Sequence, residues 1–234
     1  MEVEPLFTVK VGCPYCEQVF VTSRVRPRFK KPSRIDSDFC THYDEGKVNP
    51  DYYVVRVCPS CGCASTENSL KHWYEPQRRK FEARIANQWK NRDYGGERTW
   101  EDALATYQLA LLTAQTIGES HRVVAGLLHH IAWLYRYRND VVEERRYMQY
   151  ALDAYVAVLE QEWRDQNDAR LIFIIGELYR RLGEFNEAVK CFSKIVHDKR
   201  IMDAAMIRAA REQWTLIREE MREATENATS SMAD

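Results

Sequence analysis

The sequence lacks any segment suited to a membrane. Its longest apolar run, LIFIIG at 171–176, is far shorter than the roughly 20 residues that a helix needs to cross a bilayer. The N-terminal MEVEPLFTVKVGC starts with acidic residues and has no apolar stretch long enough for a signal peptide. We therefore expect a cytoplasmic protein without membrane contact, in a compartment that keeps thiols reduced.

The chain also lacks an excess of either charge. Its 34 basic and 35 acidic residues give a formal net charge of −1. Composition alone therefore predicts no attraction to nucleic acid, and only a local patch of charge can support such a function. The sequence shows no glycine-rich phosphate loop and no pairing of a nucleophile with a base. These absences favour a binding protein over an enzyme.

Proline is absent after Pro76, and the chain differs in composition before and after this point. The earlier part contains most of the cysteines and has short β-forming stretches at 9–12, 19–25 and 52–57. The later part has apolar residues at helical spacing. Because proline is tolerated in the first turn of a helix, we place the boundary here. The predicted organisation is a head at 1–76, a helical region at 77–224 and a flexible polar tail at 225–234.

Two cysteine pairs in the head have the spacing of metal knuckles. Two residues separate the cysteines of each pair, so both thiolates of a tight turn can face one ion. Proline stiffens each turn, and Gly62 permits the left-handed backbone that closes the second. Four thiolates form a tetrahedral zinc site, with iron as the alternative metal for the same ligands. The predicted ligands are Cys13, Cys16, Cys58 and Cys61.

The other cysteines and two nearby histidines are predicted not to bind the metal. Cys63 lies two residues after a ligand, on the opposite side of an extended chain. Cys40 fits the small core of the head, and Cys191 fits a helix as a buried apolar residue. His42 and His72 are weaker ligand candidates than any of the four paired cysteines. A dithiol redox pair of the thioredoxin type would need one pair opening a helix, which this setting does not offer.

A basic stretch lies between the knuckles, with no acidic residue between Glu17 and Asp36. A strand over RVRPRF would place its arginines on one face. This pattern is typical of a solvated edge hairpin, and it is also a candidate contact for nucleic acid or for an acidic protein partner. Asp36 and Asp38 follow and can pair with these cations. The candidate contact residues are Arg24, Arg26, Arg28, Lys30 and Lys31.

The helical region contains a repeat that resembles the tetratricopeptide pattern. Small residues at Gly176 and Ala188 would let two helices approach, with Tyr179 and Phe192 beside them. An earlier copy around 128–151 has Glu144 where a small residue belongs. A first pair covers 78–92 and 99–112, and a final helix over 202–224 would cover the end of the stack. In the segment 129–138, we expect Trp133 to lie in the core and Arg136 and Arg138 to lie on a solvated face.

The head resembles a known bacterial family. CPYC at 13–16, VRPRF at 25–29, DSDFCTHY at 36–43 and NPDYYVVRVCPSCGCAS at 49–65 follow the order of segments in domain of unknown function 2225. The resemblance implies a zinc-ribbon-like head followed by helices, and it implies no established activity. It also implies that Cys63, which stands where the family has an aromatic residue, is not a ligand, and that Cys40 has a role in packing or as a fifth thiol near the metal.

The predicted fold is therefore α+β and mostly α, with a small zinc-ribbon-like β head and a tetratricopeptide-like helical array. The favoured function is a non-enzymatic, zinc-binding scaffold or adaptor whose helices bind a protein or peptide. One alternative is a nucleic-acid-binding regulator that uses the basic stretch at 24–34. A second alternative is a thiol redox or metal-dependent enzyme.

Overall fold

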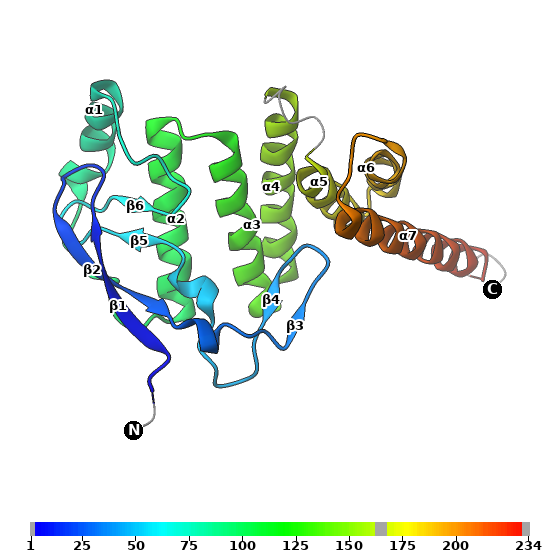
Figure 1. Ribbon diagram of the computed structural model, residues 1–234, viewed down its shortest axis with the longest axis horizontal. Coiled ribbons are helices and arrows are strands. Elements are labelled where there is room, and N and C mark those ends of the chain that lie inside the picture. Colours follow the sequence, from blue (N-terminus) through cyan, green and yellow to red (C-terminus); the bar gives the residue numbers. More distant parts are fainter. Residues whose placement is uncertain (1–2, 162–167, 231–234) are drawn as a thin grey trace. The chain divides into compact units, whose positions relative to one another are not determined.

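The computed structural model describes residues 3–161 and 168–230, with side chains described up to Arg222. Within these residues, short antiparallel strand pairs come first and seven α-helices follow (Figure 1). The predicted α+β, mostly α, class is thus confirmed. None of the described helices is long and apolar enough to cross a membrane.

Three separate two-stranded sheets form the strand part of the head. The longest is an antiparallel ribbon in which Leu6 lies opposite Val25 and Gly12 opposite Val19. The sheets consist of β1 (Leu6–Gly12) with β2 (Val19–Val25), β3 (Arg34–Ile35) with β4 (Thr41–His42), and β5 (Arg56–Val57) with β6 (Ala64–Ser65). Three 3-10 helices accompany them: η1 (Pro27–Phe29), η2 (Pro50–Tyr53) and η3 (Ala86–Gln88).

Proline interrupts two of the predicted strands. The strand expected to continue through RVRPRF ends at Val25, because Pro27 fixes its own φ, offers no N–H to a partner strand and begins η1. The three arginines therefore do not share one strand face. Likewise, Pro50 begins η2, in which the side chain of Asn49 accepts a hydrogen bond from the Asp51 N–H. Only Arg56–Val57 of the predicted strand at 52–57 remains extended in a sheet.

The helices begin and end at recognisable signals. Thr99 caps α2 by accepting a hydrogen bond from the Asp102 N–H, and the helix ends at Gly118 with φ of 69°. Gly183, with φ of 89°, ends α5 in the same way. The helices are α1 (Glu75–Arg84), α2 (Trp100–Ile117), α3 (His121–Tyr137), α4 (Val141–Gln161), α5 (Ala169–Leu182), α6 (Phe185–His197) and α7 (Ala204–Ser230).

The chain divides into two compact units, unit 1 at residues 1–151 and unit 2 at residues 152–234. In unit 1 the head shares its core with helices, since Val57 and Ala64 pack in one cluster with Tyr107 and Ala110 of α2. Arg98, 5% exposed, connects the same parts by donating to the carbonyl oxygens of residues 52, 55 and 94. The predicted boundary near residue 76 therefore falls inside unit 1, where it marks a change in amino-acid composition.

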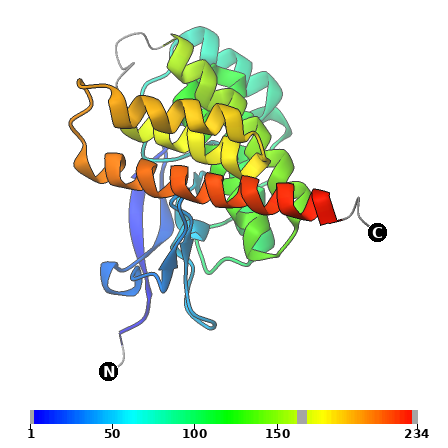
Figure 2. The same cartoon turned by 90° about the vertical axis from the view of Figure 1, so that its right-hand side faces the viewer.

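Unit 2 contains the helix pair expected around Gly176. A Cβ at this glycine would lie 2.9 Å from both Cys191 Cβ and Phe192 Cε1, so α5 and α6 touch where a small residue was predicted. Helices α5, α6 and α7 lie side by side (Figure 2). The tetratricopeptide character of this pair stays a prediction. The backbone of α7 runs through Ser230, into the predicted tail, and residues 231–234 lie outside the described part of the chain.

Candidate metal centre

Each cysteine pair lies in the turn of a hairpin, as the spacing predicts. The first knuckle, residues 13–17, joins β1 to β2, and the second knuckle, residues 58–62, joins β5 to β6. In both, the residue after the second cysteine has a left-handed backbone, with φ of 63° at Glu17 and 74° at Gly62. In both, this residue donates its N–H to the carbonyl of the first cysteine, at 3.1 and 2.9 Å. The two turns are therefore built alike.

The four predicted sulfurs lie together. Cys13 Sγ is 3.6 Å from Cys61 Sγ, and Cys16 Sγ is 3.7 Å from Cys58 Sγ. All four sulfurs lie within 4.8 Å of one another. Tetrahedral zinc with bonds of about 2.3 Å sets its sulfur ligands about 3.8 Å apart. The spacing and the all-sulfur donor set thus fit one tetrahedral ion.

The electrostatics of the cluster favour a cation at its centre. Hydrogen bonds from Cys58, Cys61 and Cys63 lower the pKa of Cys13. Hydrogen bonding to Cys13, together with burial, raises the pKa of Cys58 to about 11 and raises that of Cys61 further. Thiols this close together oppose one another's ionisation, because like charges repel. A divalent ion would supply the charge that lets all four sulfurs lose their protons.

Aromatic side chains close the surroundings of both knuckles. Tyr15 packs against Phe81 of α1 with ring centroids 4.7 Å apart, and Trp73 packs against the same phenyl ring at 5.1 Å. The ring of Trp89 lies on Gly62, where a Cβ would come within 2.5 Å of it, and its Nε1 donates to the Pro59 carbonyl at 2.7 Å. Trp89 also explains why the predicted helix over 78–92 ends early. The chain leaves α1 at Arg84 and carries this ring to the second knuckle.

The fifth thiol beside the cluster is Cys63, whereas Cys40, for which the resemblance implied either packing or a place near the metal, packs elsewhere. Cys63 is 1% exposed and packs in one cluster with Cys13, Cys58 and Cys61, and its interaction with the Cys13 thiol together with burial raises its pKa well above the usual value. Cys40 instead lies 3.6 Å from the hydroxyl of Tyr137, and burial raises its pKa to about 12. Cys191, half-buried, contacts Gly176 in unit 2.

A second polar cluster, which the sequence did not predict, surrounds Asp38. This carboxylate is fully buried and forms a bidentate pair with Arg136, at 2.9 and 2.7 Å. Trp133 Nε1 also donates to it at 3.1 Å. The expectation that Arg136 lies on a solvated face is wrong, because its side chain is only 11% exposed and also donates to Glu144 at 2.7 Å. Glu144 departs from the repeat pattern for this reason.

Asp36, Cys40 and His42 also lie close enough to bind an ion. However, Arg34 and Arg136 already contact the two oxygens of Asp36, at 3.1 and 2.9 Å. Burial opposes ionisation of Asp36, but His42 and Arg136 together lower its pKa below the usual value. A metal here would have to displace a guanidinium. We therefore assign this group to the ion-pair cluster of Asp38. His72, the other histidine considered, is exposed beside the first knuckle.

The predicted basic contact residues differ in how far they are neutralised. Arg24 is paired with Glu67. Arg26 and Arg28 donate to the backbone carbonyls of Glu4 and Val3, at 3.1 and 3.3 Å, and their guanidinium groups lie over phenyl rings. Lys30 and Lys31 are exposed. Among the described residues, no carboxylate pairs with these last four, so their charge stays open to solvent.

The sequence profile of one bacterial family matches residues 6–217 of the chain. Its description is "uncharacterized protein conserved in bacteria", DUF2225. No curated protein matches the chain, and no solved structure matches it. The match includes both knuckles, the Asp38 cluster and all seven helices at least in part.

Proposed function

We propose that this chain, which belongs to the bacterial family DUF2225, is a zinc-binding interaction protein without catalytic activity at its metal. The observation that supports this is the group of four sulfurs within 4.8 Å of one another. A catalytic zinc keeps a coordination position open for water or substrate, whereas four thiolates fill a tetrahedral ion. The metal would then hold the head together, and a cytoplasmic location would keep its thiols reduced.

Zinc is favoured over iron by its preference for a closed tetrahedral set of thiolates and by its lack of redox chemistry. Elemental analysis of the purified chain should give one zinc per chain. Cys58→Ser should lose the metal, whereas Cys191→Ser, which removes a thiol of unit 2, should retain it. A red protein with one iron per chain would show that the bound metal is iron. A preparation of folded chain that binds no metal at all would contradict the proposal.

The binding role is assigned to the helices of unit 2. The close approach of α5 and α6 at Gly176 supports it, because small residues at helix contacts are the basis of the tetratricopeptide-like pattern. Such arrays bind protein or peptide segments on their surface. Leu216 of α7 is 42% exposed and offers a position for a photo-crosslinker.

The test uses the metal-loaded chain with a crosslinker at position 216 and, as the matched control, at the exposed Val19 of β2. A defined peptide or protein adduct that forms only from position 216 would support binding by unit 2. Adducts that form equally from both positions would count against it. A well-defined turnover that depends on the metal would contradict the non-catalytic role.

A second candidate function is binding of nucleic acid by the basic stretch. It is favoured by the unneutralised charge of Arg26, Arg28, Lys30 and Lys31, and by a groove of 630 Å³ beside Phe29. Phosphate contacts make such binding fall steeply with salt. Exchange of both lysines for Ser should therefore weaken binding to single-stranded RNA or DNA and reduce its salt dependence. No binding at low salt would remove this candidate.

A further inference from the structure

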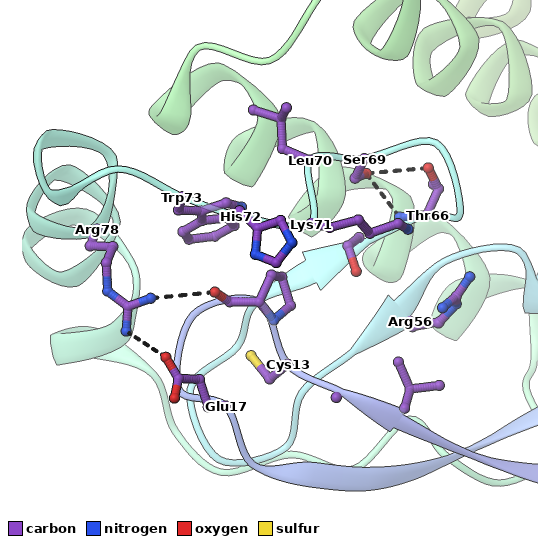
Figure 3. A pocket seen from close by; sticks show the side chains of 14 residues that line it. Cys13, Glu17, Arg56, Thr66, Ser69, Leu70, Lys71, His72, Trp73 and Arg78 are labelled. Carbon is purple, nitrogen blue, oxygen red and sulfur yellow. Dashed lines mark hydrogen bonds and ion pairs between the residues drawn. The ribbon is translucent and has the colours of Figure 1, made fainter.

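A cavity of 520 Å³ lies beside the first knuckle, and Cys13, one of the four sulfur ligands, is among the residues that line it. The knuckle, the β5–β6 hairpin, the segment 69–73 and the start of α1 form its walls (Figure 3). Figure 3 shows Arg56 at one end of this cavity and Trp73 with Arg78 at the other. Its volume lies within the range of roughly 300–1,000 Å³ that is usual for small-molecule sites.

The charge of the cavity is positive. Three cations, Arg56, Lys71 and Arg78, line it, and the only carboxylate of the lining is Glu17, 3.8 Å from Arg78. Arg56 is 13% exposed and meets one carboxylate, that of Glu67, at 3.3 Å. Since Glu67 also pairs with Arg24, one negative charge serves two guanidinium groups. Burial lowers the pKa of Arg56, and the charge of Arg24 lowers it further, so an added anion would stabilise this end of the cavity.

Two buried donors in the cavity wall have no partner. Among the described residues, nothing accepts a hydrogen bond from Arg56 Nε or from Trp73 Nε1, although both atoms are buried. Both groups are donors only, so the partner that each requires is an acceptor. Buried donors without an acceptor are costly and rare in proteins. Both side chains line the cavity, so a small shift of either would bring its donor against a ligand that supplies the missing acceptor.

We infer that this cavity binds a small organic molecule that carries an oxyanion, with the oxyanion at Arg56 and Lys71 and a second acceptor at Trp73. Val11, Leu70 and the Trp73 ring supply apolar surface for the body of the molecule between its ends. The knuckle forms one wall, so the site requires the metal-bound head of the proposed function.

Isothermal titration calorimetry on the zinc-loaded chain tests this with AMP, pyrophosphate and citrate, at an ionic strength held constant with potassium chloride. At least one of the three should bind, and the comparison separates phosphate from carboxylate ligands. Binding should also shift the indole N–H resonance of Trp73, which Trp73→Phe identifies by its disappearance. Zinc is measured in every sample, so loss of the metal and loss of the anion site are distinguishable.

The variants separate the two ends of the cavity. Arg56→Gln should weaken binding about tenfold or more, because it removes a charged donor, and Trp73→Phe should weaken it about two- to tenfold. If Arg56→Gln does not fold, Lys71→Gln takes its place in the test, because it removes a charged donor of the cavity at an exposed side chain. Arg84→Gln, which removes the same charge from an exposed position of α1 outside the cavity, should leave binding unchanged. Failure of all three probes to bind zinc-loaded protein, or binding that these variants do not alter, would overturn the inference.

Discussion

Unit 1 and unit 2 differ in how far along the chain their decisive contacts reach. In unit 1, the sulfurs of Cys13 and Cys61 are 48 positions apart in sequence, and Asp38 and Arg136 are 98 apart. In unit 2, the buried carboxylate of Glu177 pairs with Arg180 and Arg181, three and four positions away on the same helix, and the longer-range pair of Arg180 with Glu220 spans 40 positions. Closing long loops costs entropy that strong contacts must offset. Unit 1 therefore depends on a few strong long-range contacts, and unit 2 on helix packing.

The largest expected effect comes from removing one sulfur ligand. Cys58→Ser should release the metal and unfold unit 1, including α1, because structural zinc contributes about 10 kcal/mol or more and a domain has only about 5–15. Helices α5 and α6 should stay protected from hydrogen exchange, as measured by mass spectrometry. Acid should act like the variant, since protons compete with the metal for thiolates. Persistent protection of α1 and α2 in the metal-free chain would show that unit 1 does not depend on its metal.

The second-largest expected effect concerns the buried ion pair of Asp38 and Arg136. Arg136→Met leaves the carboxylate of Asp38 buried without its guanidinium, which should lower the free energy of unfolding of unit 1 by about 3–5 kcal/mol in urea titrations. Arg138→Met is the matched control, because this side chain is 53% exposed and pairs with Glu101 at the surface. The control should change stability by no more than about 1 kcal/mol. Equal losses in both variants would remove the distinction between them.

A pair of glycine substitutions should act with opposite sign in the two units. Gly176→Ala should destabilise unit 2 by about 1–3 kcal/mol, because the new Cβ meets Cys191 and Phe192 at 2.9 Å. Gly126→Ala, in the interior of α3 with no atom within 4 Å of the new Cβ, should stabilise unit 1 by up to about 1 kcal/mol. Thermal unfolding monitored by circular dichroism measures both. A gain in stability at position 176 would show that α5 and α6 can separate without loss.

The smallest effect concerns the difference between the two knuckles. Glu17 adopts the left-handed conformation that Gly62 adopts in the second knuckle. Glu17→Gly should therefore stabilise the zinc-loaded chain by about 1 kcal/mol, since glycine carries no Cβ penalty there. Gly62→Ala should do the reverse and more, because of the ring of Trp89. A differential scanning calorimetry measurement in which Glu17→Gly lowers the melting temperature would contradict this account of the first knuckle.

Features that depend on neighbouring residues were predictable from sequence. The proline-containing knuckle turns and the strand over 19–25 appear where the local pattern placed them. The four metal-binding candidates were found because each knuckle is itself a local motif. Glu144 was the one local departure that coincides with the Asp38 cluster. It is a charged residue where the repeat pattern has a small one, and it pairs with Arg136.

Other features depend on where distant segments meet. Nothing adjacent to Arg136 indicates that Asp38 will face it, and nothing adjacent to Cys40 indicates that it will lie against Tyr137. The early end of α1 likewise follows from the packing of the Trp89 ring against Gly62. Helical propensity over 78–92 was real, but a tertiary contact outweighed the small free-energy preference of each residue.

By itself, the sequence determined the chemistry of the knuckles and the succession of helices, because turn geometry and apolar periodicity are set by residues a few positions apart. Only the tertiary structure decided which cysteine became the fifth thiol, which arginine neutralised Asp38 and which donors in the cavity wall were left without acceptors. Those outcomes depend on the distance between side chains remote in sequence, which is fixed only when the chain has packed.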